Sequence, residues 1–310
     1  MRYTLFFLFA FAGTTVLFVS CKDDNCTETA WYQDADGDGL GNPDVSQTAC
    51  EQPAGYVADN TDTDDTGGSS GSGLHAAFAE FDKNNFNIYI DGQEIVIESN
   101  GLPNHTSPYW SNTTPRTAVD PMGNTITTPA AATNHPLFAE DNCTTYADMA
   151  PGNIDDFNGS YTLRVPIKPT LANSSTATGL GAIGMAVSGA MIYNDEEGPN
   201  VALGQAVVSL DCNGAHTGPQ SYHYRLEPKA WSNDDENLIG IISDGFFLYG
   251  RKCHSTGTYP TDLDDSGGHT SITQHSTTAE YHYHIQNELY LNAYYILFPG
   301  DFKGSPNAIQ

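Results

Sequence analysis

The sequence has few basic side chains. Its 310 residues include 11 Lys and Arg against 38 Asp and Glu, which gives a formal charge of −27 at pH 7. Binding of nucleic acid depends on cationic side chains that neutralise phosphates, so this balance argues against nucleic acid as a partner. It disfavours attraction to anionic lipid surfaces for the same reason. An acidic surface instead suits cations and solubility in a salty medium.

The signatures of two enzyme mechanisms are also missing. No nucleophile elbow is expected, because the pattern Gly-x-Ser-x-Gly occurs only in the Gly/Ser-rich stretch of residues 66–73 and not between a strand and a helix. The pattern Gly-x-Gly-x-x-Gly occurs at residues 179–184, but no helix is expected after it, so it does not form a loop of the type that cradles phosphates. Nucleophilic catalysis therefore has little support in the sequence.

Long apolar runs are rare, and the clearest one, residues 5–19, follows the basic Arg2. It is shorter than the roughly 20 residues that span a bilayer, and its layout is that of a secretory signal. We expect residues 1–20 to be a lipoprotein signal peptide and Cys21 to carry the lipid; an ordinary signal peptide and an uncleaved anchor are the alternatives.

The residues after Cys21 bear on where the protein is displayed. Lys22-Asp23-Asp24 resembles the signal that sends lipoproteins of the Bacteroidetes to the cell surface. We therefore expect an acyl anchor in the outer membrane lipid and a domain that faces the cell exterior. The alternative is an ordinary charged tether.

Only six cysteines are present. Without Cys21 an odd number remains, in an oxidising compartment where disulfides persist, so one is free or is a metal ligand. Two pairings are considered, Cys26 with Cys50 and Cys212 with Cys253.

A Gly/Ser-rich linker, residues 66–73, divides the chain. The acidic segment with this linker spans residues 21–73, and a larger domain spans residues 74–310. In that domain residues 86–90 alternate in polarity, Asp91-Gly92 forms a hairpin turn, and residues 94–98 return as the second strand. The prediction is a mainly β domain, a β-sandwich-like or irregular multi-stranded antiparallel fold with long loops, preceded by a short acidic stalk.

The acidic segment contains the front half of a calcium loop. Asp34, Asp36 and Asp38 alternate, and Gly39 follows at the sixth position, where a calcium loop turns sharply. An EF-hand would need an acid at the twelfth position, which is Val45 here. The segment resembles thrombospondin type 3-like repeats of exported proteins, and that resemblance implies that a second acidic cluster completes the site. The expected calcium ligands are Asp34, Asp36, Asp38, Asp62 and Asp64, and a solvated acidic spacer is the alternative.

The sequence Tyr281-His282-Tyr283-His284 is the main candidate for a functional site. If it is a strand, alternate side chains share a face, so both imidazoles lie on one side and both phenols on the other. Two imidazoles on a rigid strand form a two-point chelate for zinc, copper or iron. The expected metal ligands are His282, His284, His223, His216 and His269. The side chains expected to support them by hydrogen bonds are Tyr281, Tyr283, Tyr222 and Asp244.

A degenerate copy of this motif occurs earlier in the chain, as Tyr222-His223-Tyr224-Arg225. Arg225 stands where the other motif has its second histidine. We interpret the two segments as related strands, of which the later one has kept the fuller chelate.

Together these motifs resemble, in their order, proteins with a YHYH domain. The resemblance covers about residues 85–298, and it implies no defined biochemical activity. Arg225 and Phe247 depart from the family's pattern, and Arg225 weakens the earlier motif as a chelate. The segments that carry the resemblance are residues 100–105, 183–189, 212–216, 222–224, 244–250, 268–270 and 281–284.

Three functions remain open at this point. The first is a surface metal-binding module, for which copper is favoured and zinc is the second choice. The second is an extracytoplasmic metalloenzyme, an oxidoreductase or a hydrolase with an open coordination position. The third is an adhesion or matrix protein in which the histidines only hold strands together. A surface glycan or protein partner also remains open, and the sequence does not identify it.

Overall fold

The computed structural model describes residues 28–34, 41–62, 73–110, 116–119, 125–128, 137, 159–218, 221–229 and 231–310. The structure is mainly β, which confirms the predicted fold class. In the described part of the chain the helical segments are three short 3₁₀ turns, η1 (Ala76–Glu80), η2 (Leu203–Gln205) and η3 (Val207–Ser209). Among the described residues, no helix has the length and apolar character that crossing a membrane requires.

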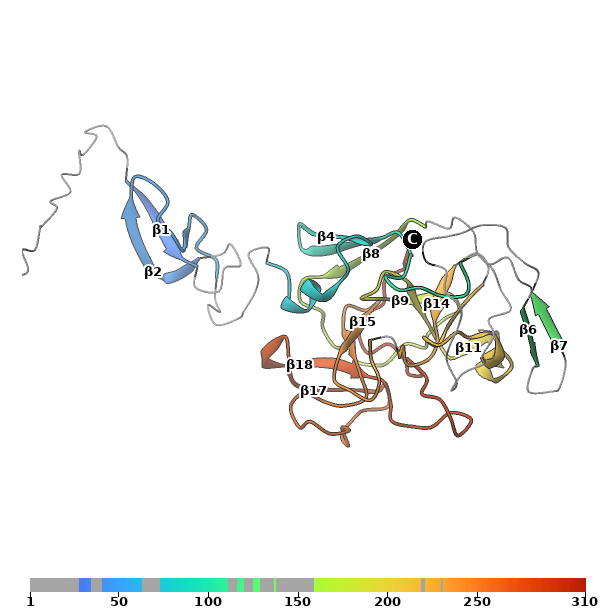
Figure 1. Cartoon of the computed structure of the whole chain (residues 1–310). Coiled ribbons are helices and arrows are strands. Elements are labelled where there is room, and N and C mark those ends of the chain that lie inside the picture. Colours follow the sequence, from blue (N-terminus) through green and yellow to red (C-terminus); the bar gives the residue numbers. More distant parts are fainter. Residues whose placement is uncertain are drawn as a thin grey trace, which may run out of the picture.

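An eight-stranded mixed sheet forms the centre of the domain (Figure 1). Most neighbouring strands are antiparallel, but β10 with β14 and β16 with β18 are parallel. In spatial order the strands are β13 (Ala215–Thr217), β14 (Tyr222–Tyr224), β10 (Met191–Tyr193), β9 (Ala182–Ala186), β15 (Leu238–Ile242), β16 (Phe247–Tyr249), β18 (Ser276–His284) and β17 (Gly268–Thr273).

The other sheets are smaller. A three-stranded antiparallel sheet has the order β4 (Phe86–Asp91), β5 (Glu94–Ser99), β8 (Tyr161–Pro166). Two-stranded ribbons join β6 (Arg116–Val119) to β7 (Thr125–Thr128) and β11 (Glu196–Gly198) to β12 (Val201–Ala202). The acidic segment forms its own sheet of β1 (Thr29–Gln33), β2 (Asn42–Ala49) and β3 (Tyr56–Val57).

The predicted hairpin is β4 and β5, with its turn one residue further along the chain. Asp91 pairs with Glu94, so Gly92 and Gln93 form the two-residue turn. Gly92 has a φ of 67°, a conformation that favours glycine and that suits the tight turn of a right-twisted hairpin.

Both faces of the central sheet are covered. On one face, β4, β5 and β8 contribute side chains such as Ile97 and Leu163 to a core shared with Met185 and Ile241. On the other face, Trp110 and aromatic residues of the C-terminal segment pack on the sheet. Burial on both sides explains why the short strands β14, β15 and β16 consist entirely of buried residues.

Candidate metal centre

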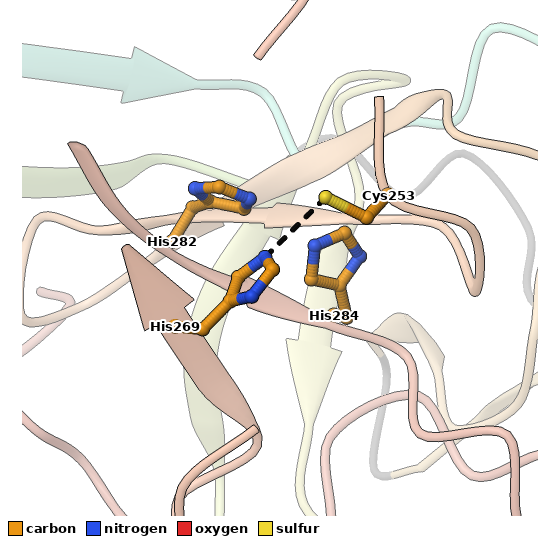
Figure 2. Close-up of side chains that lie close together, drawn as sticks. All are labelled: Cys253, His269, His282 and His284. Carbon is orange, nitrogen blue, oxygen red and sulfur yellow. Dashed lines mark hydrogen bonds between the residues drawn. The ribbon is translucent and has the colours of Figure 1, made fainter. Parts of the chain in front are cut away.

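The hairpin β17–β18 brings two histidines side by side. The two strands are antiparallel, and His269 is the direct partner of His282 in the register. His284 follows two residues later on the same face of β18. Strand β16 runs parallel to the end of β18, and the turn after β16 carries Cys253. Three imidazoles and one thiol therefore face one another (Figure 2).

The spacing of these four side chains suits a metal ion. One ligand atom from each residue lies within 4.8 Å of those of the other three. A tetrahedral ion with bonds of about 2.0–2.3 Å holds its ligand atoms roughly 3.3–3.8 Å apart. The separation of Cys253 Sγ from His269 Nε2, 3.4 Å, already lies in this range. All four residues are buried, so the cluster could hold a transition-metal ion away from solvent.

A hydrogen bond on Nδ1 orients each imidazole of the cluster. His282 Nδ1 lies 3.0 Å from the Glu280 carbonyl oxygen, and His284 Nδ1 lies 2.7 Å from that of Gly250. His269 Nδ1 lies 2.9 Å from Asp262 Oδ1. Because each Nδ1 donates to an oxygen, each Nε2 carries a lone pair that can bind a metal.

The protonation states favoured by the site also suit metal binding. Burial and, to a smaller extent, the neighbouring His284 lower the pKa of His282 to about 4. Burial likewise lowers the pKa of His284 to about 4. Both rings are therefore neutral near pH 7, the form that coordinates metals.

The thiol of Cys253 is biased toward its thiolate. Burial opposes ionisation, but hydrogen bonds from Ser255 and Ser271 and the nearby His269 outweigh this effect and lower the pKa of Cys253. The Sγ atom lies 3.1 Å from Ser255 Oγ and 3.3 Å from Ser271 Oγ. The thiolate is the form of cysteine that binds metals.

The phenols of β18 lie on the face opposite the imidazoles. Tyr283 donates a 2.5 Å hydrogen bond to Asp244 Oδ2, which also accepts from the backbone N–H of Lys303 and Gly304. Tyr281 donates to Asp264 at 3.2 Å. Asp244 and the two phenols therefore anchor the back of the strand, and Asp244 does not hold an imidazole.

Two of the expected ligands, His216 and His223, lie elsewhere. They sit on β13 and β14, at the edge of the sheet opposite β17 and β18. They cannot join the cluster around His282, and this part of the predicted ligand set is corrected. Tyr222 lies with them and donates to Asp211 Oδ2 at 2.5 Å.

Cys253 was not among the expected ligands, since it was considered as a disulfide partner of Cys212. It is a free thiol, so that bridge is wrong. The odd number of cysteines did indicate that one could be a metal ligand, but the count does not show which one.

Several other expected residues lie outside the described part of the chain. They belong to the calcium site, the lipidation site and the candidate bridge between Cys26 and Cys50. Among the expected calcium ligands, Asp34 and Asp62 are described, and Asp62 is buried. The backbone N–H of Asp62 donates to the Gly41 carbonyl at 3.2 Å. The predicted site residues that fall outside are Asp36, Asp38, Asp64, Cys21 and Cys26.

Comparison with known families gives a match to part of the chain. Residues 162–262 match the family model described as YHYH protein. The chain carries a YHYH domain. The match includes the strand β14 and reaches Cys253, but it ends before the hairpin that supplies the three histidines of the cluster. No curated protein and no solved structure matches the chain.

Proposed function

We propose that the β domain of this chain binds one transition-metal ion through Cys253, His269, His282 and His284. The observation that carries this proposal is the convergence of one buried thiol and three imidazoles whose Nδ1 atoms are already engaged. Thiolate and imidazole ligands suit both copper and zinc, and sites of this type generally bind Cu²⁺ more tightly than Zn²⁺. Copper is therefore the proposed ion, and zinc is the second choice.

The site supports a binding role better than a catalytic one. Catalytic zinc sites keep an open position beside three protein ligands, whereas four protein ligands close the tetrahedron. The four side chains are only 0%, 8%, 2% and 2% exposed, in the order Cys253, His269, His282, His284. Two cavities, of about 380 and 310 Å³, are lined by other residues. A closed site serves sequestration, acquisition or structural cross-linking.

The setting proposed for this activity is the cell surface. The apolar run at residues 5–19, Cys21 and the acidic residues after it support an exported lipoprotein held by an acyl anchor in the outer membrane. The alternating acids at Asp34, Asp36 and Asp38 support a calcium-stiffened stalk between the anchor and the domain.

Elemental analysis of the protein purified without a histidine tag tests the function. After reconstitution with Cu²⁺ or Zn²⁺ and dialysis, we expect about one ion per chain, and we expect Cys253→Ser and His282→Ala to lose it. His254→Ala is the matched control, because His254 is exposed and pairs with Glu236 beside the cluster. Wild-type protein that retains neither metal would contradict the proposal.

Spectroscopy separates the binding role from the catalytic one. A Cu²⁺–thiolate bond gives a visible charge-transfer band, and Co²⁺ in a zinc site reports coordination number. We expect azide to leave both spectra unchanged because the site is closed. A spectrum that changes with azide would reveal an open position and favour the metalloenzyme.

A further inference from the structure

The central sheet has an internal twofold pattern. Reading outward from the central pair β9 and β15, each side continues with an antiparallel neighbour (β10 or β16), a parallel strand (β14 or β18) and an antiparallel edge strand (β13 or β17). The chain order of the strands is also the same on the two sides. The four strands on one side are thus equivalent to the four on the other.

The register of the two central strands shows where the twofold axis lies. Met185 pairs with Ile241, and each occupies the same position in its own half, two residues after Ile183 and Ile239. The hydrogen bonds on either side of this pair match. Val187 N donates to Ile239 O at 2.9 Å, and Ser243 N donates to Ile183 O at 2.8 Å.

The turns before the histidine strands are equivalent as well. Asp211 Oδ1 accepts from the backbone N–H two and four residues later, at 2.8 and 3.2 Å. Asp264 Oδ1 does the same at 2.9 and 3.2 Å. Gly214 and Gly267 follow with φ values of 67° and 83°, where a side chain would be strained. These details repeat although the two hairpins differ in length.

Two of the four cluster residues have exact counterparts in type and geometry. His216 faces His223 across β13 and β14 as His269 faces His282 across β17 and β18. The ring centroids are 4.6 Å apart in the first pair and 5.0 Å in the second. His223 Nδ1 lies 3.1 Å from the carbonyl oxygen of Ser221. In the same way, His282 Nδ1 lies 3.0 Å from the carbonyl oxygen of Glu280. His223 Nε2 is buried and has no hydrogen-bond partner in the described part of the chain.

The other two positions differ. Glu197 stands at the position of Cys253, and its Oε1 lies 3.4 Å from His216 Nε2, the same distance as between Cys253 Sγ and His269 Nε2. Arg225 stands at the position of His284. Its Nη2 lies 3.2 Å from Glu197 Oε1.

The Arg225 guanidinium is held firmly. Its Nη1 donates to the carbonyl oxygens of Asn194 and Glu196, both at 2.6 Å. The guanidinium also lies over the ring of Tyr193, 5.1 Å from its centroid. With 4% exposure, Arg225 is a buried cation whose positive charge is matched by Glu197 and the carbonyl dipoles.

We infer that the domain is an internal duplication of one metal-binding unit, and that in the first copy the Arg225 guanidinium takes the place of the metal ion. An arginine stays charged at all accessible pH values, so it repels a divalent cation from His216 and His223 while it neutralises Glu197. The domain therefore binds one ion, in the second copy. This inference rests on the proposed function only for that second copy.

Restoring the two lost ligands should create a second metal site. In wild-type background, Glu197→Cys with Arg225→His should raise the metal content from about one to about two ions per chain. A protein that carries these two substitutions together with Cys253→Ser and His282→Ala should bind about one ion, in the first copy. The matched control, Glu197→Cys with Arg225→Gln, removes the charge without adding an imidazole and should bind the new ion at least tenfold more weakly.

Three outcomes are decisive. The inference is overturned if the restored protein folds, as judged by circular dichroism, and gains no metal. It is also overturned if His216→Gln with His223→Gln lowers the metal content of the otherwise wild-type protein, because the first copy would then bind an ion already. If the restored protein does not fold, the metal content of the His216→Gln, His223→Gln protein tests the inference instead. Metal in the restored first copy but none in wild type would contradict the proposed function alone.

Discussion

Each imidazole of the cluster makes a hydrogen bond from its Nδ1 to an oxygen, and one of these oxygens belongs to a side chain. Glu280 and Gly250 provide backbone carbonyls, which substitution does not remove, whereas His269 relies on the carboxylate of Asp262. His269 lowers the pKa of Asp262 through a hydrogen bond, so the carboxylate is ionised at neutral pH. This pair is the residue-scale feature of the site that mutation can probe.

Asp262→Ala should weaken metal binding without removing a ligand. Loss of the acceptor frees the His269 ring and lowers its basicity, and such changes typically cost about 10–100-fold in metal affinity. Competition with a chromophoric chelator measures the dissociation constant. Asp265→Ala, an exposed acid in the same loop, is the control and should change affinity by less than about threefold. Equal effects of the two variants would indicate only a general loss of negative charge.

At the scale of elements, strand β18 has two functional faces. Its imidazoles face the cluster, and its phenols bind acids on the other side of the sheet, where Asp244 joins the strand to the backbone of Lys303 and Gly304. Burial raises the pKa of Asp244, and the hydrogen bonds from Tyr283 and the backbone offset part of this rise. The phenol therefore donates a hydrogen bond to a buried carboxylate, and this contact contributes to the stability of the domain.

Tyr283→Phe should lower stability more than it changes metal binding. The variant leaves a buried acceptor without one of its donors, which costs about 1–3 kcal/mol. Chemical denaturation of the metal-free protein measures the loss. Tyr259→Phe removes an exposed phenol that donates to Asp234, and it should cost less than about 0.5 kcal/mol. A large fall in metal affinity with unchanged stability would contradict this division between the two faces.

For the whole molecule, the junction of β9 and β15 holds the two halves of the sheet together. A Cβ on Gly184 would lie 2.6 Å from the Ile241 carbonyl oxygen, and one on Gly240 would lie 2.1 Å from that of Met185. Both contacts are with backbone of the opposite strand, which cannot move aside without separating the halves. The two glycines allow the halves to pack closely.

Gly184→Ala and Gly240→Ala should each destabilise the domain, by about 1–3 kcal/mol or more, because overpacking forces backbone shifts. The midpoint of thermal unfolding measures the effect. Gly179→Ala is the control, since a Cβ there meets nothing within 4 Å. If either central variant matched the control, the two halves would not be held together at this junction.

Local patterns predicted several features correctly. Period-two alternation located β4, the hairpin turn after it located β5, and strand-like segments of this kind predicted a mainly β domain. The alternation in Tyr281-His282-Tyr283-His284 correctly placed the imidazoles and the phenols on opposite faces of one strand. These features depend only on the geometry of an extended chain, in which neighbouring side chains point in opposite directions.

By itself the sequence determined the fold class, the presence of a YHYH domain and the His282–His284 pair, since each rests on short motifs of residues that are neighbours in the chain. Only the tertiary structure decided which other residues complete the cluster. Strand pairing places His269 and Cys253 beside that pair and carries His216 and His223 to the opposite edge of the sheet. The sequence does not distinguish these two groups of histidines, because a ligand set is defined by distances between strands, and those are set by packing across the whole sheet.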